Sequence, residues 1–195
     1  MSKKFLILLF LIPFQLMFAQ KSLLKDFPEG YTPKEIGKRI AYRFLTEKHA
    51  LHVGKWIGYP ETFYWSGALR YADGAKDKEL IQRLQEKFDF LFTEEKILQP
   101  IMNHVDLNMF GSLPLEFYLV TKDLKYRYLG LPYADSQWEL PRNAKPHEKE
   151  WAEKGYSWQT RLWIDDMYMI TIVQTRAYKV TKDKKYIDRA AKEMV

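Results

Sequence analysis

The chain of 195 residues contains no cysteine and few histidines. The lack of cysteine excludes disulfide bonds, thiolate catalysis and lipid attachment through a cysteine side chain. The four histidines are His49, His52, His104 and His147. His49 and His52 could share one face of a helix, but no third ligand stands near them, so a metal site is not expected. We expect neither a metal nor another cofactor.

Several common catalytic motifs are also missing. The sequence has no glycine-rich phosphate loop, no HExxH zinc motif and no Ser-His-Asp order. Its formal net charge is +6, and the basic residues are scattered along the chain. A scattered positive charge suits an acidic ligand without requiring one, and it does not indicate a nucleic-acid-binding surface.

Long apolar runs are absent apart from one near the N-terminus. Two lysines precede the run Phe5–Phe14, and the small residue Ala19 follows it. This order is typical of a secretory signal peptide that is cleaved after Ala19. The run is too short for a stable membrane span. We therefore expect a signal peptide at residues 1–19 and export of residues 20–195 to the periplasm or the medium. The sequence does not indicate an oligomeric state.

Aromatic residues are frequent, at 16% of the chain. One interpretation is a large aromatic core. The other is that some rings line a groove for sugars, because the C–H faces of sugars stack on indole and phenol rings. Tyr64, Trp65, Trp158 and Trp163 are the rings that stand near predicted helix starts.

Helix signals follow one another along the chain, and no strand pattern competes with them. Thr32-Pro33-Lys34-Glu35 is a capping box with proline at the first helical position. Further starts are predicted at Pro60, Asp77, Asp123 and Asp183. The predicted helices cover about residues 32–49, 60–73, 77–92, 107–120, 123–130 and 162–180, with another from 183. Residues 131–157 contain three prolines and are predicted to be a long loop.

One pattern repeats along the chain. Residues 118–126 match residues 178–186, and residues 71–80 form a weaker copy. Each copy ends one helix, turns tightly and caps the next helix with aspartate. Repetition of this kind indicates a series of helical hairpins.

Such hairpins can stack as a solenoid or close as a toroid of inner and outer helices. The helices before the repeated turns are almost uncharged, whereas those after them carry one charged face. This alternation favours inner and outer rings. The chain reaches Val195 inside a predicted helix and has fewer hairpins than a closed ring needs. We therefore expect an all-α fold with about half of an (α/α)6 toroid.

The strongest polar signal on the predicted inner helices is carboxylate. Asp106 stands at the start of one of these helices, and Asp165 and Asp166 stand at the start of the next. If these helices run parallel, Asp106 would meet Asp165 or Asp166 at one end of the ring. Two carboxylates in a partly dry site move their pKa values apart, so that one can act as a general acid. The alternative is that each aspartate only caps its helix.

Three stretches together resemble the unsaturated rhamnogalacturonyl hydrolases. They are Tyr64 three residues before Gly67, the segment His104–Gly111, and Trp163-Ile164-Asp165-Asp166 before an apolar helix and a Val-Thr-Lys-Asp turn. The resemblance covers about residues 32–195. These hydrolases (glycoside hydrolase family 105) and the related unsaturated glucuronyl hydrolases (family 88) fold as an (α/α)6 toroid and are called six-hairpin glycosidases.

The resemblance implies a reaction. Such enzymes remove a 4,5-unsaturated uronic acid from the non-reducing end of oligosaccharides that polysaccharide lyases produce. They protonate the enol-ether double bond and add water, and the resulting hemiketal collapses. The implied partner is an unsaturated acidic oligosaccharide, with no nucleic acid and no stable membrane insertion.

The resemblance also implies roles for individual residues. Asp165 falls on the general acid/base and Asp106 on a second essential aspartate. Tyr64 and Trp163 fall on substrate contacts, and His104 lies near a site histidine of the glucuronyl branch. Further substrate-binding candidates beside them are Trp158 and Asp166, and Asp166 is alternatively the helix cap or the support of Asp165.

Two other functions remain open from the sequence. A non-catalytic helical toroid could bind acidic saccharides without cleaving them. Another enzyme on the same toroid, such as a sugar epimerase or a lyase, would carry more histidine in the funnel than this sequence shows.

Overall fold

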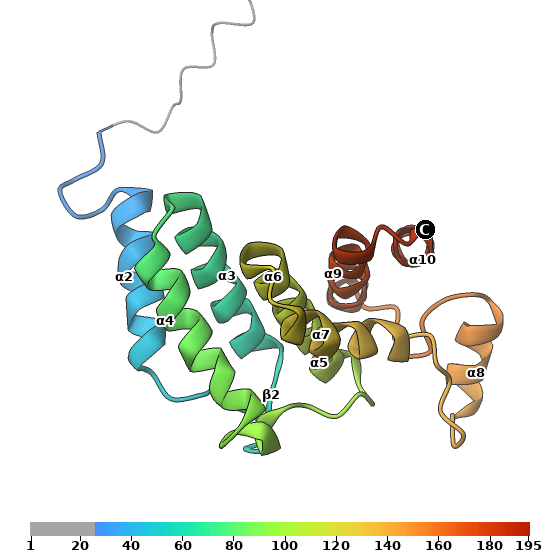
Figure 1. Ribbon diagram of the computed structural model, residues 1–195. Coiled ribbons are helices and arrows are strands. Elements are labelled where there is room, and N and C mark those ends of the chain that lie inside the picture. Colours follow the sequence, from blue (N-terminus) through green and yellow to red (C-terminus); the bar gives the residue numbers. More distant parts are fainter. Residues whose placement is uncertain (1–25) are drawn as a thin grey trace, which may run out of the picture. The chain divides into compact units, whose positions relative to one another are not determined.

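The computed structural model describes residues 26–195 (Figure 1). The predicted signal peptide lies outside the described residues. The chain divides into one compact unit up to Ile36 and a second from Gly37 to Val195. In the first unit, the backbone N–H of Thr32 donates to Glu35 Oε2 at 3.0 Å, and the N–H of Glu35 donates to Thr32 Oγ1 at 3.2 Å. The predicted capping box is therefore confirmed, and it begins α2 (Pro33–Thr46).

The second unit is built almost entirely of helices. After α2, the chain forms α3 (Tyr59–Ala75), α4 (Lys78–Asp89), α5 (Val105–Asn108), α6 (Ser112–Thr121), α7 (Leu124–Ser136), α8 (Pro146–Glu153), α9 (Ile164–Thr181) and α10 (Lys184–Glu193). Within residues 26–195, the strands are limited to a hairpin of β1 (Leu51–His52) and β2 (Trp56–Ile57). None of the helices in this part of the chain is both long and apolar enough to cross a membrane.

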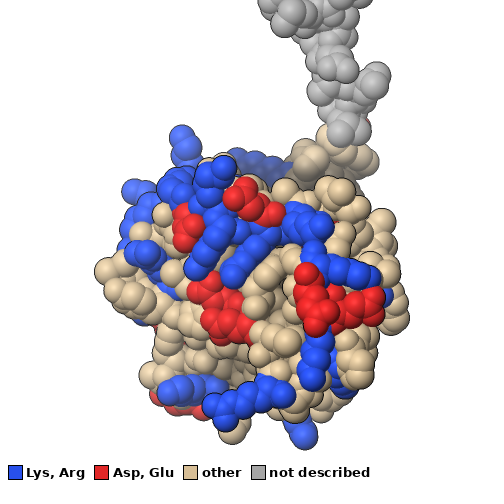
Figure 2. All heavy atoms as spheres, turned by 90° about the vertical axis from the view of Figure 1, so that its right-hand side faces the viewer, with Lys and Arg blue, Asp and Glu red and all other residues tan. Residues whose placement is uncertain are grey.

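The helices form two sets. Helices α3, α6 and α9 lie side by side with α6 in the middle, and α4, α7 and α10 pack on them in turn (Figure 1). Glu116 is the one charged residue of α6, whereas α10 has a strongly charged face. This is the predicted alternation of inner and outer helices, so the all-α hairpin fold of the six-hairpin glycosidase type is confirmed. On the face shown in Figure 2, basic side chains are interspersed with acidic ones.

The repeated sequence has a repeated structure. Lys122 and Lys182 adopt left-handed backbone conformations, with φ of 64° and 63°, and each ends an inner helix. The aspartate after each lysine accepts a hydrogen bond from the backbone N–H two residues on, and thereby caps the next helix. The weaker copy keeps the same plan with Lys76 (φ 55°) and Asp77.

The repeat also joins each outer helix to the one before it. The hydroxyl of Tyr126 on α7 donates to Asp89 of α4 at 2.6 Å. Three helices on, the hydroxyl of Tyr186 on α10 donates to Asp135 of α7 at 3.2 Å. The same position of the hairpin thus makes the same contact twice.

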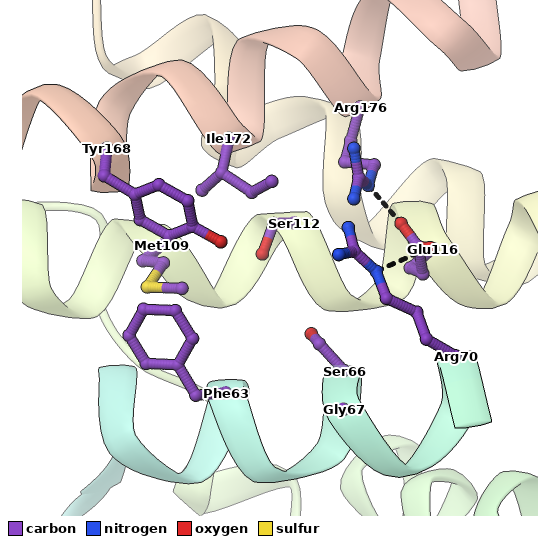
Figure 3. Close-up of a pocket in the computed structure, with 10 residues that line it drawn as sticks. All are labelled: Phe63, Ser66, Gly67, Arg70, Met109, Ser112, Glu116, Tyr168, Ile172 and Arg176. Atoms are coloured by element: carbon purple, nitrogen blue, oxygen red, sulfur yellow. Dashed lines mark hydrogen bonds and ion pairs between the residues drawn. The ribbon is translucent and has the colours of Figure 1, made fainter. Parts of the chain in front are cut away.

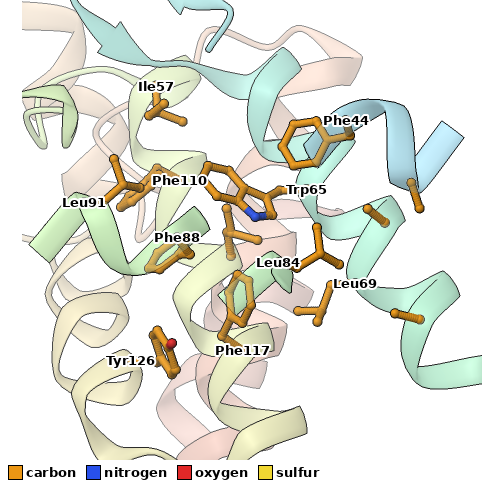
Figure 4. Close-up of a cluster of buried hydrophobic side chains, with 14 of the residues drawn as sticks. Phe44, Ile57, Trp65, Leu69, Leu84, Phe88, Leu91, Phe110, Phe117 and Tyr126 are labelled. Carbon is orange, nitrogen blue, oxygen red and sulfur yellow. The ribbon is translucent and has the colours of Figure 1, made fainter. Parts of the chain in front are cut away.

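Aromatic rings fill the core between the first two hairpins (Figure 4). Phe88 lies at its centre, with ring centroids 4.8 Å from Phe117 and 5.3 Å from Trp65. All three side chains are fully buried. Much of the aromatic content therefore stabilises the fold, as the first of the two interpretations expects.

The predicted long loop at residues 131–157 is only partly a loop. Helix α7 continues through Pro132 to Ser136, where buried Tyr133 donates its hydroxyl to the backbone oxygen of Pro100 at 2.7 Å. Pro146 occupies the first turn of α8 and so begins a helix. The prolines are compatible with both helices because tertiary contacts hold α7 and because a first-turn proline needs no backbone donor.

Candidate active site

The start of α9 places its two aspartates in opposite surroundings. Trp163 is the extended residue before the helix, and Asp165 and Asp166 lie in the first turn. Asp165 is exposed and has no hydrogen-bond or ion-pair partner within residues 26–195. The side chain of Asp166 is only 1% exposed. One carboxylate is therefore open to a ligand, and the other is part of the protein interior.

Arg161 is the partner of the buried carboxylate. Asp166 accepts hydrogen bonds from the backbone N–H of Arg161 at 3.2 Å, from its Nε at 2.9 Å and from its Nη2. The same Nη2 donates to Asp106 Oδ1 at 3.0 Å. These hydrogen bonds with Asp166 and Asp106 raise the pKa of Arg161, with Asp166 contributing most. A single guanidinium thus joins the start of α9 to the start of α5.

His104 completes this cluster. It precedes α5, and its Nδ1 accepts a hydrogen bond from the backbone N–H of Asp106 at 3.2 Å. Its Nε2 lies 3.4 Å from Nη1 of Arg161. Burial lowers the pKa of His104, and the positive charge of Arg161 acts in the same direction, while the Asp106 carboxylate opposes both. The neutral imidazole is therefore favoured here. Because Nδ1 is the acceptor, the proton of the neutral ring lies on Nε2, so the approach of Nε2 to Arg161 is a contact and not a hydrogen bond.

Trp163 is held over the same guanidinium. The centre of the Arg161 guanidinium lies 4.4 Å from the centroid of the Trp163 ring, within the range of a cation–π contact. The Trp163 side chain is nevertheless largely exposed. An aromatic ring that is held from one side and open elsewhere can stack on the apolar face of a sugar.

Trp158 lies across a cavity from this cluster. The cavity has a volume of about 130 Å³, and its walls include Trp158, His104 and Arg161. Trp158 itself is buried, and its Nε1–H donates to the backbone oxygen of Ser136 at 2.7 Å. The segment is anchored further by Glu193 of α10, which accepts from the backbone N–H of Ser157 at 3.1 Å.

Tyr64 lies apart from the other candidates. It is exposed and lines a different cavity, together with residues of α2 that include Phe44. Its neighbour Phe63 instead faces α9, where its ring stacks on Tyr168 at a centroid distance of 5.6 Å. Adjacent residues of a helix point about 100° apart, so Phe63 and Tyr64 lie on different faces of α3.

Asp106 was expected to meet Asp165 or Asp166, and the structure brings it to Asp166, with one cation bonded to both carboxylates. That cation is Arg161, and His104 and Trp163 lie around the same guanidinium. Arg161 was not among the residues predicted from the sequence. A signal for it exists, because a buried carboxylate needs a cation, and Arg161 is the nearest cation to Asp166 in the sequence.

In the described part of the chain, the histidines and carboxylates do not form a metal-binding site. No group of three or more His, Cys, Asp or Glu side chains within residues 26–195 could hold a metal ion. His49 instead contacts two carboxylates, with its Nδ1 2.7 Å from Glu61 and its Nε2 3.1 Å from Glu95.

Comparison with known proteins identifies a family. A sequence model described as Glycosyl Hydrolase Family 88 matches residues 33–195. The match begins at the first residue of α2 and includes the whole cluster around Arg161. Neither a curated protein nor a solved structure matches the chain.

Proposed function

Because the chain belongs to Glycosyl Hydrolase Family 88, a family of glycosidases, we propose that it removes 4,5-unsaturated uronic acid from the non-reducing end of lyase-generated oligosaccharides. The observation that carries this proposal is the contrast at the start of α9. Asp165 is open and unpartnered, while Asp166 beside it is buried against Arg161. A catalytic acid must be accessible to the substrate, whereas a residue that only positions it can be buried.

In this proposal Asp165 is the general acid. Its carboxyl group donates a proton to one carbon of the enol-ether double bond, and the neighbouring carbon gains cationic character that the ring oxygen shares. Water adds to that carbon and returns a proton to Asp165. The hemiketal formed in this way collapses, the ring opens, and the saccharide that follows is released.

The cluster around Arg161 would fix the geometry of the site. Arg161 fixes Asp106 and Asp166 relative to each other, and Trp163 offers an exposed aromatic face. Asp106 would orient the attacking water or the substrate, as the second essential aspartate. The rigid hydrogen bonds would limit the reorganisation that the reaction requires.

We propose rhamnogalacturonan fragments as the first substrates to test, because of the resemblance carried by residues 104–111 and 163–166. Export through a signal peptide fits such a role, since lyases act on polysaccharides outside the cytoplasm. Nucleic acid and stable membrane insertion are not part of the proposed function.

The test follows the ultraviolet absorbance of the conjugated double bond in defined unsaturated disaccharides. The chain should consume this absorbance, and Asp165→Asn should lower kcat by about 10²–10⁴-fold, the usual contribution of a general acid. Asp188→Asn, at an exposed position of α10, is the matched control and should keep full activity. Unchanged turnover in Asp165→Asn would refute the role of Asp165. Binding with the chromophore left intact would favour a non-catalytic saccharide-binding protein.

A further inference from the structure

A second cavity lies between the three inner helices α3, α6 and α9 (Figure 3). Its volume is about 150 Å³. None of its lining residues belongs to the cavity beside Arg161. An engineered protein cavity of about 150 Å³ binds one benzene molecule, so this space suits a single sugar ring.

One end of this cavity carries a net positive charge. Glu116 of α6 accepts from Nε of Arg70 on α3 at 3.3 Å and from Nε of Arg176 on α9. Two cations therefore share one anion. The terminal nitrogens of both guanidinium groups have no hydrogen-bond partner within the described part of the chain.

The unused donors belong partly to buried residues. Arg176 is 7% exposed and Ser112 is 4% exposed, and both line the cavity. Figure 3 shows the hydroxyls of Ser112 and Ser66 pointing toward each other across the space, between the arginines and the apolar end. Neither hydroxyl has a hydrogen-bond partner within residues 26–195. These unpartnered donors face the cavity and are accessible to water, so an anionic or hydroxyl-rich ligand can replace that water at this end of the cavity.

The opposite end is aromatic and apolar. Phe63 and Tyr168 stack on each other there, and Met109 and Ile172 lie close to them (Figure 3). A ligand that fits both ends must combine a carboxylate with an apolar face. A uronic acid has this combination, because its ring presents C–H groups on one face and its carboxylate projects from the edge.

We propose that the cavity between α3, α6 and α9 binds an acidic sugar residue, with its carboxylate on Arg70 and Arg176 and its ring beside Phe63 and Tyr168. The choice of an acidic sugar rests on the proposed function. The geometry of the cavity is independent of Asp165 and of the chemistry at α9, so binding is tested without turnover.

The probe is a matched pair of saturated sugars. Methyl galactosiduronate and methyl galactoside differ only in a carboxylate in place of a hydroxymethyl group, and neither contains the reactive double bond. Their affinities for the chain are measured by NMR titration at low salt. We expect the uronate to bind at least about 10-fold more tightly, since a charge-assisted hydrogen bond contributes about 1.5–3 kcal/mol.

Arg70→Gln is the informative variant, because the Arg70 side chain is 51% exposed and its loss should not disturb folding. The variant should lower the affinity for the uronate by about 10- to 100-fold and leave the affinity for the neutral sugar unchanged. Arg142→Gln, at an exposed site away from the cavity, is the control and should bind like the parent chain. Arg70→Lys keeps the charge without the planar fork and should recover part of the affinity.

The outcomes separate this proposal from the proposed function. Equal affinity for the two sugars, or uronate binding that survives Arg70→Gln, overturns the acidic-sugar site even if the chain is an active hydrolase. Uronate binding that depends on Arg70 supports the site even if the chain leaves the unsaturated disaccharides intact.

Discussion

Removing Arg161 should destabilise the second unit more than removing the charge of Asp166. The two side chains are 30% and 1% exposed. Arg161→Gln leaves the Asp166 carboxylate buried without a cation. Asp166→Asn leaves a guanidinium that water can still reach and that keeps its hydrogen bond to Asp106 at 3.0 Å. The two changes remove the same ion pair. Arg161→Gln leaves a buried carboxylate without a cation, whereas Asp166→Asn leaves a guanidinium that water can reach.

The expected magnitudes follow from this difference. Leaving a buried charge unpaired costs about 3–5 kcal/mol. Weakening the hydrogen bonds of Arg161 by neutralising Asp166 should cost about 1–2 kcal/mol. For a chain of this length, each kcal/mol lowers Tm by about 2–4 °C, so Arg161→Gln should lower Tm by about 6–20 °C and Asp166→Asn by about 2–8 °C.

Thermal and urea unfolding of both variants and of the double variant test this reasoning. The double variant no longer contains the buried Asp166 charge and leaves only Asp106, which is 17% exposed, without its cation. Its destabilisation should therefore be smaller than the sum of the two single effects by at least about 1 kcal/mol. Arg142→Gln is the control, and its effect should stay within about 0.5 kcal/mol. The reasoning fails if Asp166→Asn costs as much as Arg161→Gln, or if the two effects simply add.

Two further predictions concern stability. Gly111→Ala should lower the free energy of unfolding by about 1–3 kcal/mol, because the added Cβ would lie 2.2 Å from Cβ of Tyr133. Gly74→Ala has no atom within 4 Å of the added Cβ, so it should instead stabilise α3 by up to about 1 kcal/mol. Urea unfolding measures both effects. Burial lowers the pKa of His49, but the hydrogen bonds and charges of Glu61 and Glu95 together outweigh it and raise the pKa above 6.5. The protonated histidine therefore stabilises the fold below pH 6.5, and this stability should be lost as the pH rises through the raised pKa. His49→Gln should remove the pH dependence that begins above about pH 6.5, whereas an unchanged slope would contradict the assignment.

The helical hairpins were largely predictable because their signals are local. The capping box at Thr32 and Glu35 has the expected hydrogen bonds. The repeated lysine and aspartate turns have the same backbone conformation at Lys122 and Lys182. A turn or a cap involves neighbours in sequence, so a short stretch of residues is sufficient to specify it.

The segment at residues 131–157 was less predictable because proline has more than one role. Pro132 lies inside α7 and Pro146 begins α8. Buried Tyr133 keeps α7 in place through its hydroxyl contact with Pro100, which is 33 residues earlier. No local pattern contains that contact.

The candidate site shows the same division. The sequence alone shows that a tryptophan and two carboxylates, those of Trp163, Asp165 and Asp166, stand at the start of an apolar helix. The sequence does not show that Arg161 bonds to Asp106, since 55 residues separate them. It also does not show that Tyr64 faces α2 while its neighbour Phe63 faces α9.

The sequence by itself determined the hairpin repeat, the helix caps, the alternation of uncharged and charged helices, and the pair of aspartates at one helix start. Only the tertiary structure decided which aspartate is open, because adjacent helical residues point about 100° apart and packing sets the direction of each. Asp166 is turned inward to Arg161, and Asp165 is turned to solvent. The cavity between α3, α6 and α9 likewise exists only once three distant helices pack together.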